Sequence, residues 1–515
     1  MFYRTQVQNL NRMLRNLNAM RYAARCSRII TFGLSKELIN QFSADVRLSR
    51  AVSQALTLQT DMIAMNPTLF QSGDELEVSK QVQKGIMQFY DDTTVNPYIS
   101  LAADGPWIVT AHGSVLYDTG GYGMLGFGHN PAVAMNAISK PQVMANVMTP
   151  NIAQKNFMDA IRIEIGHTRG GMCPYERFAC LNSGSESVTL AMRIADVDAR
   201  HMTAEKGPHP GRDTVLVSLK GSFHGRTERP AMASDSCQKV YTEHLSSFRQ
   251  RHDKLRTVEP NNIEHLREVW GQIDHEGKHV EVMLMEPVMG EGNPGEAIKR
   301  EFYDEARKLA DQYRSLLLVD SIQAGLRTRG TLSIMDYPDY QNAIAPDFET
   351  FSKALNAGQF PFSVLAMGPR VPEIYVRGLY GNTMTTNPRA LDIATAVLES
   401  FTPKLRANIN IMGSYLVNAL HGLQHKFPEI IERVTGTGLL IACHIKPGYK
   451  AYGAFDSLEY LCRKKGLNVI HGGKNALRFT PVFEISHAET DLMIAILDEV
   501  FSEVKYSNKR PPQVY

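Results

Sequence analysis

Cysteine is scarce in this sequence, and its arrangement indicates neither a disulfide framework nor a metal site. The cysteines form no Cys-x-x-Cys pair, and no histidine lies near them at metal-ligand spacing. We interpret them as reduced, unpaired thiols of an intracellular protein, and we expect no metal. The six are Cys26, Cys173, Cys180, Cys237, Cys443 and Cys462.

Long apolar runs and a strong net charge are also missing. No apolar run reaches the roughly 18 residues that a membrane-spanning helix needs. The formal charge of +2 gives no reason to expect a nucleic-acid or membrane partner. At 515 residues with 43% hydrophobic content, the chain can bury a large core and form two or more packed units.

Acidic residues are absent from residues 1–36, which contain Arg4, Arg12, Arg15, Arg21, Arg25 and Arg28. This composition fits either a mitochondrial transit peptide covering residues 1–33 or a basic helical arm. The stretch has few serines, and it continues without a break into helix-like sequence at Leu38, Ile39 and Phe42. We therefore expect a cytoplasmic protein that keeps the arm, with the mitochondrial matrix as the alternative.

The spacing of apolar residues divides the chain into four parts. Residues 1–95 mostly favour helix and form a predicted N-terminal extension. Residues 96–130 contain two short strand-like runs, and we expect this segment to join a small domain. Residues 131–389 form a predicted large domain, and residues 390–515 return to long helical patterns with a few strands, as a small α+β domain would.

Short apolar runs alternate with helical segments throughout the predicted large domain. Runs that are apolar on both faces and separated by helices favour an α/β fold, with a mostly parallel sheet covered by helices on both faces. Ligands bind such a sheet at the carboxyl ends of its strands. The runs are 178–181, 215–217, 282–285, 316–319 and 362–367.

Lys353 and Asp320 are the candidate catalytic residues. Asp320 closes the apolar run 316–319, and a buried carboxylate at such a place must be paired to remain ionised. A lysine that forms a Schiff base needs to be desolvated beside the group that tunes the cofactor. Each residue also has an ordinary interpretation, Lys353 as a solvated helix end and Asp320 as a helix cap.

Two turns after apolar runs offer groups for a phosphate and a planar ring. Residues 182–186, Asn-Ser-Gly-Ser-Glu, lie between a strand-like run and a helical pattern, where free N–H groups favour a phosphate. Ser183 or Ser185 could instead be a plain helix cap. Phe223 in the turn 221–226 could lie flat on a cofactor, although a phenylalanine in a turn more often packs, and His224 is a weaker candidate.

A glycine pattern at residues 121–126 matches the Gly-x-Gly-x-x-Gly fingerprint of dinucleotide-binding enzymes. That fingerprint requires an acidic residue about 20 positions further on to hold the ribose. No Asp or Glu occurs between Asp118 and Asp159. We therefore reject a dehydrogenase and interpret the glycines as close backbone approach near a substrate.

Taken in order, these motifs resemble the class III, or ω-amino-acid, aminotransferases, which are pyridoxal phosphate (PLP) enzymes of fold type I. The resemblance covers roughly residues 95–500, and the motifs are specific in combination. They are residues 182–186, 221–227 (Gly-Ser-Phe-His-Gly-Arg-Thr), 286–291 (Glu-Pro-Val-Met-Gly-Glu), 320–325 (Asp-Ser-Ile-Gln-Ala-Gly), 346–358, 381–388, 435–439 and 477–479.

The resemblance implies a role for each matching residue. Lys353 forms the Schiff base and moves a proton, while Asp320 keeps the pyridine nitrogen protonated. Arg478 anchors a substrate carboxylate, and Glu291 is its ion-pair gate. The cofactor is further bound by Ser183, Gly184, Ser185, Phe223, His224, Ile322 and Gln323, and by Thr383, which reaches the phosphate of the partner subunit in a homodimer.

The expected reaction is transamination from an ω-amine or amino acid to a 2-oxo acid such as 2-oxoglutarate or pyruvate. One departure concerns Ser321, because the family commonly carries Glu directly after the cofactor aspartate. This substitution puts the local support of that loop in question. A racemase, aminomutase or decarboxylase on the same cofactor is the alternative, and a cofactor-free binding protein is a more distant one.

Overall fold

The computed structural model describes residues 2–25, 27–70, 73–121, 123–144, 146–249 and 252–507. Cys26 and Tyr122 lie outside the described residues. The other five cysteines are free thiols, and four of them are buried. No helix in the described ranges is long and apolar enough to cross a membrane.

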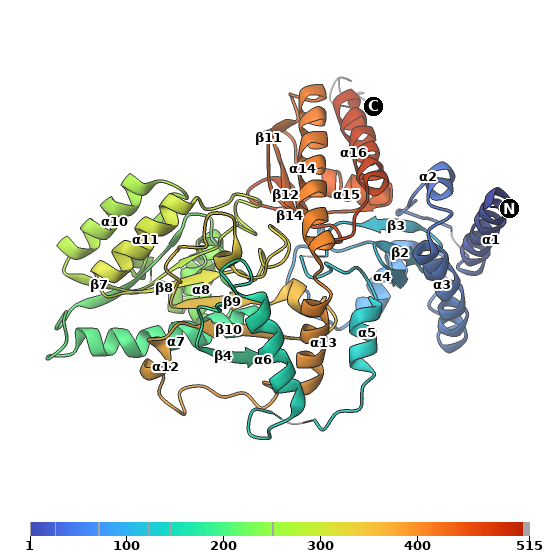
Figure 1. The fold of residues 1–515 in the computed structure, drawn as a ribbon. Coiled ribbons are helices and arrows are strands. Elements are labelled where there is room, and N and C mark those ends of the chain that lie inside the picture. Colours follow the sequence, from blue (N-terminus) through green and yellow to red (C-terminus); the bar gives the residue numbers. More distant parts are fainter. Residues whose placement is uncertain are drawn as a thin grey trace.

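A seven-stranded sheet with the order β4-β10-β9-β8-β7-β5-β6 is the centre of the molecule (Figure 1). Its neighbouring strands are parallel except for β10, which runs antiparallel to β4 and β9. The strands are β4 (Arg177–Leu181), β5 (Asp213–Leu219), β6 (Leu255–Val258), β7 (Lys278–Met285), β8 (Leu316–Asp320), β9 (Phe348–Phe351) and β10 (Ser363–Met367). This is the mostly parallel α/β sheet that the apolar runs predict.

Helices cover both faces of this sheet (Figure 1). The helix α7 (Gly184–Thr203) packs across β4, β7, β8, β9 and β10 on one face, while α10 (Ile263–His275) and α11 (Arg300–Gln312) pack on the other. The remaining helices of this part are α5 (Ala132–Ile138), α6 (Ile152–Glu164), α8 (Glu228–Ala233), α9 (Gln238–His244), α12 (Val371–Ile374) and α13 (Pro388–Glu399).

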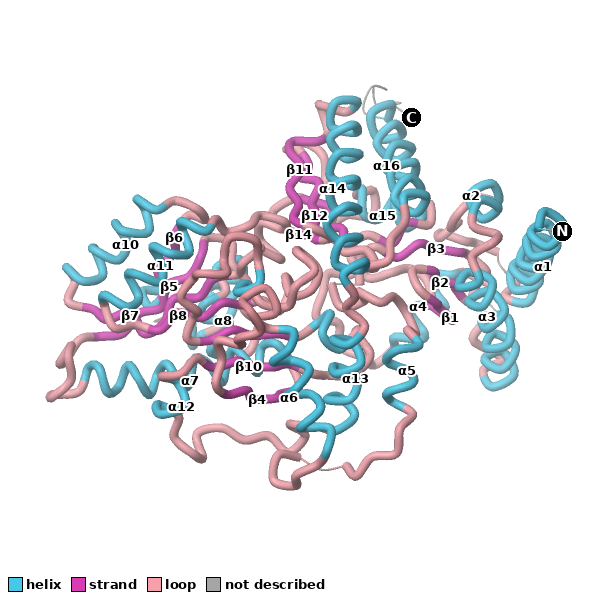
Figure 2. Tube along the Cα trace, viewed as in Figure 1, coloured by secondary structure: helices cyan, strands magenta, loops and turns pink. Residues whose placement is uncertain are grey.

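Two four-stranded sheets lie beside the central sheet, and Figure 2 separates them from the helices by colour. The first has the order β1-β2-β3-β13, so β3 (Val115–Asp118) pairs in parallel with β13 (Leu467–Asn468) from far along the chain. Its other strands are β1 (Ser100–Asp104) and β2 (Trp107–Thr110). The second contains β11 (Ile431–Thr437), β12 (Leu440–Ile445), β15 (Ala476–Phe479) and β14 (Ile470–Gly472), with α14 (Pro403–Lys426), α15 (Leu458–Lys464) and α16 (His487–Ser507).

Helices make up most of the described N-terminal part up to Gln83, and residues 84–99 contain turns and bends. Its helices are α1 (Phe2–Ala23), α2 (Lys36–Gln41), α3 (Val46–Met65) and α4 (Glu75–Gln83). The side chain of Gln59 on α3 donates to the carbonyl oxygens of Met20 and Ala111, at 2.9 and 2.6 Å. Met13, Leu17 and Met20 of α1 are buried, so the basic arm is packed against the fold.

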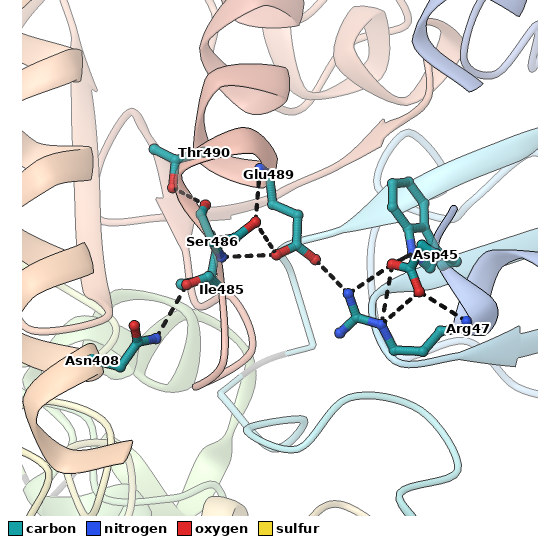
Figure 3. Close-up of polar contacts among 8 residues, drawn as sticks. Asp45, Arg47, Asn408, Ile485, Ser486, Glu489 and Thr490 are labelled. Carbon is teal, nitrogen blue, oxygen red and sulfur yellow. Dashed lines mark hydrogen bonds and ion pairs between the residues drawn. The ribbon is translucent and has the colours of Figure 1, made fainter. Parts of the chain in front are cut away.

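A polar cluster fastens this extension to the C-terminal helix α16 (Figure 3). Arg47, at the start of α3, donates to Asp45 at 2.8 Å and to Glu489 of α16 at 3.0 Å. Glu489 also accepts two hydrogen bonds from Ser486, and Asp45 accepts one from the indole of Trp107 at 2.8 Å. The cluster therefore joins residues 442 positions apart in the sequence.

Candidate active site

A cavity of about 180 Å³ opens beside the carboxyl ends of β5, β7 and β8, where an α/β sheet binds ligands. Every predicted site residue lines this cavity except Thr383 and Arg478. The predicted residues that line it are Ser183, Gly184, Ser185, Phe223, His224, Glu291, Asp320, Ile322, Gln323 and Lys353.

Lys353 lies two residues after the end of β9, at the start of a short 3₁₀ turn, with φ of 47°. This left-handed conformation is uncommon for a residue with a side chain, and such strain tends to occur at functional sites. The Nζ atom donates a hydrogen bond to Oε1 of Gln323. Burial and the positive charge of Arg478 lower the pKa of Lys353 to about 8, so its neutral, nucleophilic form is accessible near neutral pH.

Asp320 is the last residue of β8, and three neighbours hold its carboxylate. Oδ2 lies 2.9 Å from Nδ1 of His224, which donates when Asp320 is ionised. Oδ1 accepts from the backbone N–H of Ile322 at 3.1 Å and from the hydroxyl of Thr350 at 3.2 Å. The structure thus places His224 as a partner of Asp320, a contact that the sequence does not predict.

The turn before α7 presents its backbone to the same cavity. Ser183 caps α7, accepting from the N–H of Glu186 at 3.3 Å, as the helix-cap interpretation predicts. Gly225 approaches this turn so closely that a Cβ there would lie 2.3 Å from Oγ of Ser185. The N–H groups of Gly184 and Ser185 at a helix start form the kind of place that binds phosphate.

The walls of the cavity fit a pyridine ring that carries a phosphate. Phe223 and Ile322 are both partly exposed side chains in its lining, which suits the faces of an aromatic ring. Gln323 Nε2 and His224 Nε2 are buried without a hydrogen-bond partner in the described structure. Asp320 offers a buried carboxylate to a ring nitrogen, and the α7 turn offers N–H groups to a phosphate.

Arg478 on β15 is buried behind Glu291. Its Nη1 lies 2.7 Å from Oε2 of Glu291 and also donates to the carbonyl of Gly290. Burial alone would raise the pKa of Glu291, but the adjacent guanidinium lowers it below the ordinary value, so the pair is ionic. Glu291 also lines a second cleft, of about 1090 Å³, whose walls include Arg226 and His471.

Thr383 does not reach the cavity of its own chain. It is exposed, and it lines a separate cleft of about 880 Å³ together with Val147, Met148 and Tyr380. In the glycine-rich segment, the described residues 121 and 123–126 form turns and bends rather than the strand-to-helix crossing of a dinucleotide site. A Cβ on Gly123 would lie 2.0 Å from Nε2 of Gln323, which places this segment beside the cavity.

Glu286 is a residue of the site to which the sequence analysis gives no role. Its carboxylate accepts from the N–H groups of Phe223 at 3.0 Å and Gly290 at 2.8 Å, which fixes both loops at the cavity. Burial raises its pKa to about 7. The signal for it in the sequence is an acid that closes an apolar strand, as Asp320 does.

Comparison with known proteins agrees with this geometry. The family model "Aminotransferase class-III" matches residues 90–501. The acetylornithine aminotransferase of Xanthomonas axonopodis pv. citri is 29% identical over 61% of this chain and 71% of its own. The ornithine aminotransferase of Staphylococcus epidermidis is 26% identical over 79% of this chain and 94% of its own.

Solved structures share the fold. The ornithine aminotransferase of Toxoplasma gondii superposes with a TM-score of 0.71 at 20% identity, over 86% of this chain and 99% of that one. A second structure of that enzyme has PLP at its active site with partial occupancy. The family match does not favour a racemase, aminomutase or decarboxylase. The chain belongs to the class III aminotransferases and is a PLP-dependent transaminase of fold type I.

Proposed function

We propose that this enzyme transfers the terminal amino group of an ω-amino acid, of the ornithine or N-acetylornithine type, to 2-oxoglutarate. The observation that carries the proposal is the Glu291–Arg478 pair at 2.7 Å, beside the cavity that holds Lys353. While Glu291 neutralises Arg478, this guanidinium offers no free positive charge to the reacting end of the site. This state suits an amine whose reacting carbon bears no carboxylate, and the names of the relatives point to the same class of donor.

The second half-reaction needs the opposite state of the same pair. A 2-oxo acid with a second carboxylate offers an anion that competes with Glu291 for Arg478, and guanidinium binds carboxylate through two parallel hydrogen bonds. The second cleft, of about 1090 Å³, which Glu291 also lines, provides room for the distal part of the donor and has Arg226 in its wall.

The catalytic roles follow from the contacts around the cavity. Bound PLP supplies an electron sink at the substrate carbon. Lys353, with its lowered pKa, would hold and move the substrate's proton at its Nζ atom, and Asp320 would keep the ring nitrogen protonated. Phe223 and Ile322 would enclose the ring, Gln323 would support its hydroxyl, and Ser183, Gly184 and Ser185 would bind the phosphate.

We further propose a homodimer in which Thr383 completes the phosphate site of the partner. The segments 143–144, 146–152 and 376–384 support this assembly, because they contain Val143, Val147, Met148 and Met384, which are 57–82% exposed. Residues 146–148 and 380–383 line the cleft that contains Thr383, and the described parts of these segments lie at the lower edge of the molecule in Figure 1. Large exposed apolar patches of this kind mark protein interfaces.

A cytoplasmic location with residues 1–36 retained is also a proposal. Its support is the packing of α1, whose Met13, Leu17 and Met20 are buried against the rest of the chain. Removing these residues would expose the apolar surface they cover. Sequencing the N-terminus of the protein from its native source tests this, and a first residue near position 34 would favour the mitochondrial matrix.

A panel of amines assayed with 2-oxoglutarate tests the proposed donor. Ornithine, N-acetylornithine, lysine and 4-aminobutyrate are compared with alanine and aspartate, and glutamate formation is measured. We expect at least one ω-amine to exceed both α-amino acids in kcat/KM by about tenfold or more. Faster turnover of the α-amino acids would refute the proposed donor class, and no glutamate from any amine would refute the acceptor.

A further inference from the structure

Glu349 on β9 is a fully buried carboxylate beneath the cofactor loop. Oε1 accepts from the hydroxyl of Ser321 at 2.6 Å and from the N–H of Ile334 at 2.9 Å. Oε2 accepts from the hydroxyls of Tyr175 and Ser333, both at 2.5 Å. Four donors from three separate segments therefore converge on one side chain.

The four donors are all neutral groups. Among the ion pairs of the described residues, none involves Glu349. Burial raises its pKa to about 7, which shows that the charged form is costly at this position. The four hydrogen bonds offset this cost, and an apolar side chain here would leave four buried donors without their acceptor, so this carboxylate is explained by its hydrogen bonds rather than by filling space.

The position of Glu349 connects it to both candidate catalytic residues. In the β8–β9 pairing, Glu349 lies opposite Val319, and Thr350 lies opposite Asp320. Ser321, which donates to Glu349, directly follows Asp320. Strand β9 then ends two residues before Lys353.

We propose that Glu349 is a positioning residue for transamination: by holding Ser321, its carboxylate fixes the loop that presents Asp320, Ile322 and Gln323 to the cofactor. The proposal rests on the roles proposed above for those three residues. The 320–323 loop is therefore supported by a side chain of the neighbouring strand β9, which accepts the hydrogen bond that Ser321 donates.

Two serines provide a matched test, because each donates to the same carboxylate from a buried position. Ser321 belongs to the cofactor loop, whereas Ser333 lies in the segment that follows it and lines no part of the cavity. If Glu349 only stabilises the fold, Ser321→Ala and Ser333→Ala should have similar effects. If Glu349 positions the loop, only Ser321→Ala should alter the bound cofactor and turnover.

The experiment uses the PLP-loaded enzyme and measures kcat, KM, the visible circular dichroism of the cofactor, and Tm. We expect Ser321→Ala to lower kcat about tenfold and to change the dichroic band, since small misplacements at a reacting centre are costly. Ser333→Ala should lower Tm comparably and leave kcat within about twofold and the band unchanged. Equal effects of the two variants on kcat, or a wild-type band in Ser321→Ala, would overturn the proposal.

Substitution at position 349 separates hydrogen bonding from charge. A glutamine can accept from Ile334 and Ser321 and donate to hydroxyls that rotate, so Glu349→Gln should keep kcat within about threefold. Glu349→Leu should lose turnover by more than tenfold while still binding PLP. Glu281, another buried acid on the same sheet, serves as the control in Glu281→Gln.

Wild-type activity is measured in the same series. Absent ω-amine turnover in the wild type would refute the proposed donor, whereas the serine and Glu349 variants are judged by the cofactor band and by turnover of whichever amine is active. A Glu349→Leu variant that retains wild-type turnover would contradict the positioning role.

Discussion

At the scale of single residues, the chemistry depends on Lys353 being an amine rather than an ammonium ion. Only the neutral form can attack an aldehyde. Burial first, and then the positive charge of Arg478, lower its pKa from 10.5 to about 8, while the negative charges of Glu291 and Asp320 oppose this shift. The sequence predicts the position of this lysine, but its pKa comes from its burial and from neighbours contributed by β15 and by the loop after β7.

The rate at which the apoenzyme captures PLP should follow the titration of Lys353. With a pKa of about 8, roughly a tenth of the amine is neutral at pH 7 and half at pH 8. We expect the capture rate, followed by absorbance in stopped flow, to rise about fivefold over that interval and to level off above pH 9. A rate that continues to climb to pH 10.5 would show an unperturbed lysine.

Asp320→Ala should lower kcat by a much larger factor than it weakens the binding of PLP. In the role proposed for Asp320, its carboxylate would stabilise charge on the ring nitrogen during reaction, whereas the residues proposed to contact the phosphate and the ring would remain in place. We expect kcat to fall by about a thousandfold and the Kd for PLP, measured by fluorescence titration, to rise by much less. Asp198→Ala, a buried acid on α7, is the control and should keep kcat within about twofold.

At the scale of elements, the sequence predicts most of the central sheet because each apolar run is short and lies between helical patterns. β4, β5, β7, β8 and β10 are found at the predicted runs. The antiparallel direction of β10 and the pairing of β3 with β13 could not be predicted, since the hydrophobic pattern of a strand does not determine its direction or its neighbours in a sheet.

Part of the candidate site could not be predicted from the sequence either. The motif residues could be identified because their order along the chain is specific, and the strand ends bring them together. The contact of His224 with Asp320 and the four donors to Glu349 depend on side-chain orientation. The four-part division of the chain stays a prediction.

Glu291→Gln tests whether the loop after β7 works as a gate. Without the charge on Glu291, Arg478 becomes available at all times. We expect KM for the ω-amine to rise about tenfold and KM for 2-oxoglutarate to stay the same or fall, in steady-state assays. Glu296→Gln, in the same loop and partly exposed, is the control and should change neither constant by more than about twofold. Parallel changes in both constants would argue against a gate.

Arg47→Ala should loosen the connection between α3 and α16 shown in Figure 3. The change leaves Glu489, which is 3% exposed in its side chain, without its cation. We expect a loss on the order of 2 kcal/mol in the free energy of unfolding, measured by urea denaturation of the holoenzyme. Arg50→Ala removes an exposed pair with Asp104 and should cost less than about 1 kcal/mol. Equal losses would contradict this ranking.

At the scale of the whole molecule, the proposed dimer makes each site depend on two chains. Lys353→Ala removes the amine of one site, and Thr383→Glu places a negative charge where the partner's phosphate should lie. Each variant alone should be nearly inactive. Refolded together in equal amounts, they should recover about a quarter of wild-type activity, because half of the dimers are mixed and each mixed dimer has one intact site. Activity no higher than the average of the two separate variants would contradict a shared site.

The most direct test of the account is chemical trapping of the cofactor on Lys353. The PLP-loaded enzyme is reduced with borohydride, digested, and analysed by mass spectrometry. We predict a visible band that reduction abolishes and a phosphopyridoxyl group on the peptide containing Lys353, with no label in Lys353→Ala. A label on a different lysine, or an unlabelled protein in excess PLP, would contradict the central claim.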